Sequence, residues 1–409
     1  MTTGRPSSVM LWVQHLLGIG HLQRALRIAD ALIEWGSAVT VVSGGMPQSL
    51  PRNPAVTLVQ LPPLRARDAS FALLDGSGAP VDDRLREQRR AALLAAFAQA
   101  RPDALLLEGF PFARRAFRFE LDPLIAASCA VSWRSQRRLP IICSVRDIVV
   151  MRDDPTRHRE IVDRVRRDID RVLVHGDPAL IPFDASFPAA PDIADRLVYT
   201  GYIAPRTPAI ADEFVNETDA GEVIVSAGGG AAGRALLETA LAARRAGCLA
   251  RRPWRLITGT NLSDDDFDAL RANAPAGVAI ERFRDDFAAL LRGCLVSVSQ
   301  AGYNTVLDVL TARARSVLVP FAAGRETEQP LRAERLAAIG AAELVRESEL
   351  SAVVLAAAIE RAAARPAPSL AIDTGGAARS AQLITEIIGA EDAGEYRFVA
   401  PAPRAIVAR

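Results

Sequence analysis

The turn Gly18-Ile19-Gly20-His21, with Arg24 three residues later, holds the side chain best placed for proton transfer. It follows an apolar run at residues 9–13 and opens an amphipathic segment. Glycines let a backbone approach a ligand closely, and a helix start presents N–H groups to an anion. Imidazole titrates near neutral pH, so His21 could take a proton from a hydroxyl group. The alternative is a histidine that caps the helix or bonds a carbonyl, and spacing does not decide between the two.

The chain has three other histidines. His15 stands two residues past the same apolar run and is the second candidate for a base. His158 and His175 have no comparable surroundings, and we interpret them as structural or surface residues.

Three consecutive glycines, Gly228, Gly229 and Gly230, separate an apolar run from a helical pattern. Successive backbone N–H groups in such a loop form a concave site for phosphate oxygens. A tight turn that needs one positive-φ residue is the alternative. Three glycines exceed that need, which favours anion binding, and Arg234 in the following helix could add positive charge.

The segment 299–305 reads Ser-Gln-Ala-Gly-Tyr-Asn-Thr and repeats the order of strand, glycine turn and helix. The N–H groups around Gly302, Asn304 and Thr305 could hold a pyrophosphate, and the Asp308 carboxylate could accept bonds from ribose hydroxyls. The alternatives are a helix cap by Asn304 or Thr305 and a solvated Asp308.

A loop at residues 321–329 ends in Glu326-Thr327-Glu328-Gln329, and Arg325 just before it is a further candidate phosphate cation. An acid–amide pair at a helix start suits the hydroxyls of a sugar. The alternative is acidic charge that complements the helix dipole.

Composition removes several mechanisms. The chain has 409 residues, and all 49 of its cations are Arg, because Lys is absent. P-loop NTPases, protein kinases and Schiff-base enzymes each need a lysine, so these classes are excluded. The four cysteines lie far apart, without metal-ligand spacing. We expect no metal site and no cofactor, and buried thiols at Cys143 and Cys294.

Apolar runs alternate with helical patterns along the whole chain, which predicts an α/β fold. We expect strands at residues 9–13, 39–42, 105–107, 140–145, 172–174, 197–200, 222–227, 254–258, 278–283, 295–299 and 316–320. We expect helices at 82–100, 157–170, 234–245, 351–364 and 377–388, and a surface loop at the start of 64–90. Residues 110–119 alternate Phe and Arg, and we favour an amphipathic core helix over a membrane patch.

A polar, proline-containing stretch near residues 205–221 divides the pattern in two. We therefore predict two Rossmann-like, doubly wound domains, at 1–205 and 206–409, facing across a cleft. The C-terminal helix near 377–389 could pack back on the first domain.

A net charge of +1 gives no steering toward nucleic acid. No apolar run approaches the ~20 residues of a membrane span, and no targeting segment is visible. We expect a cytoplasmic protein, with a peripheral place on the inner face of the membrane left open.

The order of these motifs resembles glycosyltransferase family 28, the group of the peptidoglycan lipid-intermediate N-acetylglucosaminyltransferase, whose fold is the two-Rossmann-domain (GT-B) type. The resemblance covers nearly the whole chain and is most specific at residues 278–342. The first turn differs from the family's usual Gly-Gly-Thr-Gly-Gly-His and is instead similar to the nucleotide-sugar hydrolase of pseudaminic acid synthesis.

The resemblance implies roles for particular residues. His21 would be the base, with Gly18, Gly20 and Arg24 forming its turn. The remaining positions would bind the donor: the diphosphate at Gly228, Gly229, Gly230, Gly302, Asn304 and Thr305, the ribose at Asp308, the nucleobase near Phe283, and the sugar at Glu328 and Gln329.

We therefore expect a metal-independent, inverting, bacterial glycosyltransferase that uses a nucleotide diphosphate sugar, with UDP as the expected nucleotide. Its acceptor would be a small molecule, a glycan or a lipid-linked sugar. A nucleotide-sugar hydrolase or epimerase on the same fold is one alternative. A non-catalytic nucleotide-sugar-binding subunit is the other. A dehydrogenase is disfavoured, since neither domain has the full dinucleotide fingerprint.

Overall fold

The computed structural model describes residues 6–16, 18–50, 52–67, 72–130, 139–149, 154–204, 221–228, 233–260, 262–322 and 326–393, with side chains to 390. The described chain forms two compact units. The first contains β1 to β9 and the C-terminal helix α11, and the second contains the elements from β10 to α10. Residues 203 and 204 mark one division between them, and residues 372 and 373 mark the other.

Unit 1 is built on a seven-stranded parallel sheet of order β3-β2-β1-β6-β7-β8-β9. Its central strands are almost continuously apolar, as expected for strands covered on both faces. The strands are β1 (Ser8–Val13), β2 (Ala38–Ser43), β3 (Val56–Gln60), β6 (Ala104–Glu108), β7 (Ile141–Arg146), β8 (Arg171–His175) and β9 (Leu197–Tyr199). Because they are parallel, all their carboxyl ends meet at one edge, where ligands bind in such sheets.

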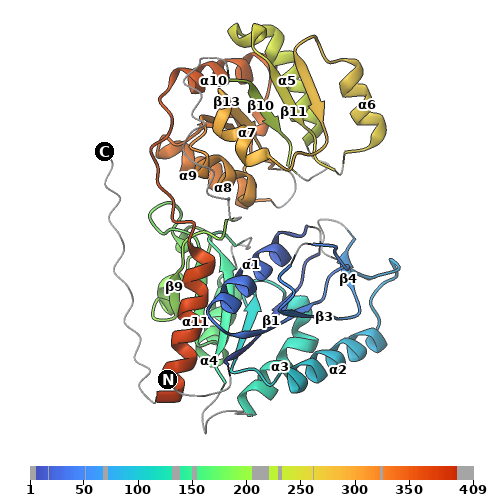
Figure 1. Ribbon diagram of the computed structural model, residues 1–409, viewed down its shortest axis with the longest axis vertical. Helices are drawn as coiled ribbons and strands as arrows, with labels where there is room; N and C mark the ends of the chain where they lie inside the picture. The colour runs from blue at the N-terminus through green and yellow to red at the C-terminus, as the bar shows by residue number, and fades with distance from the viewer. Residues whose placement is uncertain are drawn as a thin grey trace. The chain divides into compact units, whose positions relative to one another are not determined.

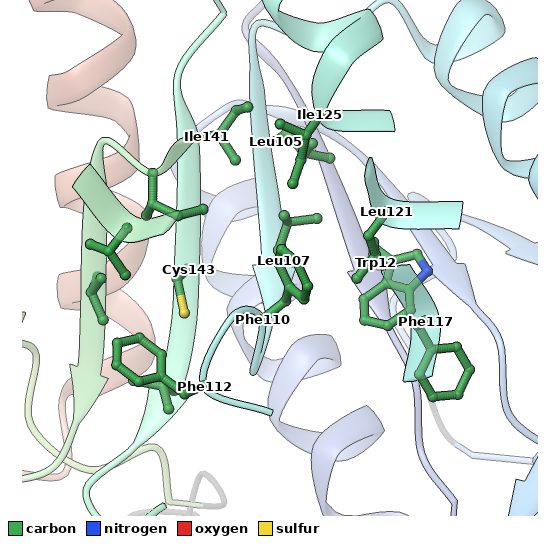
Figure 2. Close-up of a cluster of buried hydrophobic side chains, with 14 of the residues drawn as sticks. Trp12, Leu105, Leu107, Phe110, Phe112, Phe117, Leu121, Ile125, Ile141 and Cys143 are labelled. Carbon is green, nitrogen blue, oxygen red and sulfur yellow. The ribbon is translucent and has the colours of Figure 1, made fainter. Parts of the chain in front are cut away.

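Helices cover both faces of this sheet. One face packs against α1 (Gly20–Glu34) and α11 (Gly376–Ala393), which lie side by side (Figure 1). The other face packs against α2 (Asp83–Ala100), α3 (Arg118–Ala130) and α4 (Pro155–Asp168). Alternate residues of β1 divide between the two cores, with Trp12 in the aromatic one (Figure 2) and Leu11 in the other.

Two expectations for unit 1 were wrong. The stretch predicted as a surface loop contains an antiparallel hairpin of β4 (Leu64–Ala66) and β5 (Leu73–Asp75). Residues 110–119 do not form a single helix. Phe110 and Phe112 lie in a loop, a 3-10 turn follows at Arg115–Phe117, and α3 begins at Arg118. The rings of Phe110 and Phe112 are buried, so these residues form part of the core and not a membrane patch.

Unit 2 has the same kind of architecture, built on a six-stranded parallel sheet of order β12-β11-β10-β13-β14-β15. The strands are β10 (Val223–Ser226), β11 (Trp254–Ile257), β12 (Val278–Glu281), β13 (Val296–Ser299), β14 (Ser316–Leu318) and β15 (Glu343–Leu344). One face carries the main core with α5 (Arg234–Ala246), α6 (Asp264–Ala272) and α10 (Ala352–Ala364). The remaining helices are α7 (Phe287–Gly293), α8 (Tyr303–Thr311) and α9 (Glu328–Ala338). The predicted class of two doubly wound α/β domains is confirmed.

Among the described helices, none combines the length and the apolar character that a membrane crossing requires.

Candidate active site

His21 lies on the first turn of α1, at the carboxyl edge of the unit 1 sheet. Its Nδ1 is 2.8 Å from Oε1 of Glu108, the last residue of the neighbouring strand β6. α1 begins at Gly20, and its N-cap residue is Ile19 without a side-chain cap, so His21 is not a helix cap. Its partner is a carboxylate, the group that commonly orients a catalytic imidazole.

Arg24 lies one turn further along α1 and forms a buried ion pair with the same Glu108 oxygen. Its Nη2 is also 3.1 Å from His21 Nδ1. Nδ1 cannot donate to Glu108 and accept from Arg24 at once, and the shorter, charge-assisted contact with the carboxylate is the stronger one. Nδ1 therefore carries the proton, which leaves Nε2 with the lone pair that a general base needs.

The ionisation of this pair follows from burial. Burial lowers the pKa of His21 to about 3, although the charge of Glu108 acts in the opposite direction. Burial by itself would raise the pKa of Glu108, but His21 and Arg24 hold that pKa well below its usual range. At neutral pH the pair is thus a neutral imidazole next to a carboxylate, which is the base form.

The second candidate base, His15, is buried at the end of β1 and differs from His21 in its partner. Its Nε2 is 2.9 Å from the Met46 carbonyl oxygen and must therefore donate to it. No carboxylate contacts it among the described residues.

His175 has the structural role expected from the sequence. It is fully buried at the end of β8, with Nε2 2.7 Å from Ser144 Oγ and Nδ1 2.9 Å from Thr200 Oγ1. Burial lowers its pKa to about 3. His158 is also buried, edge-on to Phe187.

In unit 2, Gly228 follows β10 with a φ of 66°, a conformation that favours glycine. Its N–H lies 3.4 Å from Ser226 Oγ. Gly229, Gly230 and Arg325 lie outside the described residues, so their predicted phosphate contacts stay predictions. Arg234 is half-exposed and paired with Glu238 and Asp266.

The turn after β13 leads directly into α8, whose N-cap residue is Gly302. Asn304 and Thr305 therefore lie in the first turn of this helix, and neither caps it, contrary to the alternative drawn from the sequence. A glycine N-cap has no side chain to occupy the first N–H groups, which suits a helix start that faces an anion. Asp308 follows within the same helix.

Gln329 ties two loops of unit 2 together. Its Oε1 accepts from the N–H groups of Ala301 and Phe321, each at 3.1 Å, so the loops after β13 and β14 share one side chain. Because both partners are donors, they fix the amide orientation and leave Nε2 as the donor end.

The two neighbouring acids have partners within the protein. Glu328 is buried, with Oε1 2.9 Å from Arg332 Nη2. Glu326 Oε1 accepts from the N–H groups of Glu328 and Gln329, the first two residues of α9, whose N-cap residue is Thr327. Phe283 lies two residues past β12 and is 64% exposed. The expected contacts with the nucleotide-sugar donor stay predictions. They are those of Glu328 and Gln329 with the sugar, of Asp308 with the ribose and of Phe283 with the nucleobase.

Cys143 and Cys294 differ in burial. Cys143 is buried as expected, whereas Cys294 is only partly buried. Ser263 caps α6, and the three aspartates form its first turn. Among the described residues, no group of three His, Cys, Asp or Glu side chains could hold a metal ion.

Comparison with known proteins identifies relatives of this chain. Residues 223–382 match the glycosyltransferase family 28 C-terminal domain. A UDP-N-acetylglucosamine--N-acetylmuramyl-(pentapeptide) pyrophosphoryl-undecaprenol N-acetylglucosamine transferase from Phenylobacterium zucineum is 26% identical over 364 residues, 85% of this chain and 88% of that protein. The enzyme of the same name from Brucella anthropi is 30% identical over 176 residues, 41% of this chain and 46% of its own.

Solved structures show the same fold at low identity. The glycotransferase of kitacinnamycin matches with a TM-score of 0.59 at 18% identity, over 94% of this chain and all of that chain. Acinetobacter baumannii MurG matches with a TM-score of 0.58 at 17% identity, over 93% of this chain and 99% of its own.

Proposed function

Because this chain is a glycosyltransferase of the two-Rossmann-domain type, with a family 28 C-terminal domain at residues 223–382, we propose that it transfers a sugar from a UDP-linked donor to a hydroxyl group, with inversion and without a metal ion. The contact between His21 and Glu108 is the observation that carries this proposal. It supplies a base at the edge of the sheet where ligands of such folds bind.

In this mechanism His21 Nε2 takes the proton of the acceptor hydroxyl as its oxygen attacks the anomeric carbon. The C–O bond to the diphosphate breaks on the opposite face, which inverts the anomeric centre. The imidazolium that forms lies next to the ionised Glu108, whose charge stabilises it. Glu108 also holds the ring through Nδ1, so Nε2 is not engaged in this contact.

The leaving diphosphate needs compensating positive charge. We propose that the loop that begins at Gly228 and the N-terminus of α8 provide it through backbone N–H groups. Helix N-termini and N–H groups act in place of a metal ion in this proposal. Gln329 Nε2 would then bind a hydroxyl of the donor sugar.

Donor dependence is the first test. The full chain is incubated with a panel of UDP-sugars, with and without EDTA, while hydrophilic and lipid fractions of a bacterial extract are offered as acceptors. The lipid fraction is included because the relatives are named for a lipid-linked acceptor. We expect saturable UDP binding that EDTA does not change, and an inverted product anomer by NMR. A requirement for a divalent ion would overturn the metal-independent mechanism.

The His21→Ala variant tests the base. It should keep UDP binding and lose at least about 10²-fold in turnover, the usual contribution of a general base. Turnover that survives the substitution would remove His21 from this role. Release of free sugar by the unsubstituted chain without any acceptor would favour the hydrolase alternative, for which the Gly-x-Gly-His turn is the motivating feature.

A further inference from the structure

Arg114 closes a tight loop that follows Glu108 and β6. Gly109 has a φ of 78° and Arg114 a φ of 63°, so both lie in the left-handed region, which is unfavourable for a residue such as arginine. Phe110 and Phe112 hold the loop in the aromatic core (Figure 2), where Phe112 lies edge-on to Phe183 with ring centres 5.3 Å apart. The core therefore fixes the backbone that places Arg114 at the carboxyl edge of the sheet.

The Arg114 side chain is partly exposed, but its Nε is buried and has no hydrogen-bond partner among the described residues. Glu108 is the carboxylate within its electrostatic reach, and Arg24 already forms the direct ion pair with that group. Arg24 and Arg146 also repel Arg114. A buried N–H without an acceptor costs free energy that a bound anion would recover.

His15 offers a complementary group at the same edge. Its Nε2 donates to Met46, so Nδ1 carries a lone pair, and this atom is buried without a partner in the described part of the chain. The charge of Arg114 lowers the pKa of both His15 and His21, after the larger effect of burial, so both rings lie within its electrostatic reach. The carboxyl edge of the unit 1 sheet thus has an N–H donor on Arg114 and an acceptor nitrogen on His15 that make no hydrogen bond in the described part of the chain. Both lie near the proposed base, His21.

We propose that Arg114 binds an anionic group of the acceptor, a carboxylate or a phosphate, next to the hydroxyl that His21 deprotonates. The inference rests on the proposed function and deepens it, because it names the chemical class of the acceptor. Arg114 would be a specificity-determining residue, since an acceptor without the anion would leave its Nε without a hydrogen-bond partner.

The test measures anion binding and requires no turnover. The full chain is titrated with inorganic phosphate and, separately, with lactate, in the presence of saturating UDP that occupies the donor site. Arg114→Gln removes the cation, and Arg114→Gly removes it while relieving the left-handed backbone. Arg115→Gln is the matched control, because Arg115 is exposed and its ion pair is a long one, 3.9 Å from Glu160.

We expect saturable binding of one of the anions, weakened at least tenfold in both Arg114 variants and changed less than twofold in Arg115→Gln. The anion that binds more tightly distinguishes phosphate from carboxylate. The Arg114→Gly variant should keep the melting temperature of the unsubstituted chain, which separates lost binding from lost folding.

Equal binding in the Arg114 and Arg115 variants, or no saturable binding of either anion, would overturn the assignment. So would Arg114-dependent anion binding that is seen only when UDP is left out, because the cation would then serve the donor. If the anion binds at Arg114 but no UDP-sugar is turned over, the proposed function fails while the anion site remains. If UDP-sugars are turned over without such binding, only this inference fails.

Discussion

At the scale of single residues, Glu108 decides whether His21 can act as a base. Glu108→Gln removes the charge that stabilises the imidazolium and weakens the bond that orients the ring, so kcat should fall by roughly 10² or more while UDP affinity stays unchanged. Single-turnover kinetics on folded protein would measure this loss. Glu108→Asp, which keeps the charge but shortens the side chain, should give an intermediate rate.

A control is needed because Arg24 also depends on Glu108. Glu108→Gln leaves the Arg24 guanidinium buried without a carboxylate, which destabilises the fold. The rates should therefore be measured at a temperature where circular dichroism shows that the variant is folded. Glu160→Gln removes a partly exposed carboxylate paired with Arg118 and should leave kcat unchanged. Equal effects of the two substitutions would contradict a positioning role for Glu108.

His21 was predictable and Glu108 was not, and the reason is physical. The glycine turn marks His21 locally, because the loop and helix start that create its surroundings lie within a few residues. Glu108 ends an apolar strand 87 positions away, and only the pairing of β1 with β6 brings the two together. A carboxylate that ends a buried parallel strand is the signal that could have identified it.

Gln329 offers a second residue-scale prediction, because its carbonyl end and its amide end have separate tasks. Gln329→Glu keeps two oxygens able to accept from Ala301 and Phe321, so both loops should stay in place. It loses the Nε2 donor, so the KM for the UDP-sugar should rise about tenfold, in line with roughly 1.4 kcal/mol for one lost hydrogen bond. Steady-state kinetics would measure this, with UDP affinity as the control.

If the KM is unchanged, Gln329 only ties the loops together and does not contact the sugar. Gln329→Ala should then be the damaging variant, since it leaves two backbone N–H groups without their acceptor.

At the scale of elements, Arg89 joins the parts of unit 1 that carry the loops of the candidate site. All five of its N–H groups have acceptors: both oxygens of Glu120, Gln14 Oε1, and the carbonyl oxygens of Gly44 and Pro62. The side chain thus connects α2 with α3 and with the segments after β1, β2 and β3. Arg89 and Glu120 are both fully buried.

Arg89→Met should lower the free energy of unfolding of unit 1 by about 3–5 kcal/mol, because it leaves the Glu120 carboxylate buried and uncompensated. Arg89→Met combined with Glu120→Gln should recover most of this loss, since the amide is neutral and its oxygen can still accept from Trp12 Nε1. Guanidinium denaturation followed by circular dichroism would measure both variants.

Arg90→Met is the matched control for this pair. Arg90 is the next residue on α2, exposed and paired with Glu87, so its loss should change the free energy of unfolding by less than about 0.5 kcal/mol. A double variant as unstable as Arg89→Met alone would show that the buried charge is not the cause.

The strands that the sequence missed in unit 1 lack a clear apolar pattern. β3 reads Val-Thr-Leu-Val-Gln and is exposed at several positions, because it is an edge strand of its sheet. The hairpin β4–β5 has three residues in each strand, too few to establish a period. The central strands were predictable because burial on both faces demands continuous apolar runs, whereas an exposed edge strand such as β3 and a short hairpin leave no such pattern.

At the scale of the whole molecule, the four histidines are unevenly divided, since all of them lie in unit 1. Burial lowers the pKa of His21 and of His175 to about 3, from an ordinary value of 6.5. As the pH falls below 6.5, the unfolded chain binds protons at these positions before the folded chain does. The contribution of these two histidines to the free energy of unfolding of unit 1 is therefore fully present above pH 6.5. It is lost progressively as the pH falls toward 3.

We predict that unit 1 loses up to about 1.4 kcal/mol per pH unit for each of these two histidines between pH 6.5 and pH 5, while unit 2 loses far less. Hydrogen exchange followed by mass spectrometry at both pH values, corrected for intrinsic rates, compares β6 and β7 with β10 and β13. His175→Gln should lower the slope in β6 and β7, because one titrating group is gone while His21 and His15, whose pKa values burial also lowers, still titrate. Equal slopes in the two units would show that buried histidines do not govern the response, since unit 2 has none to titrate.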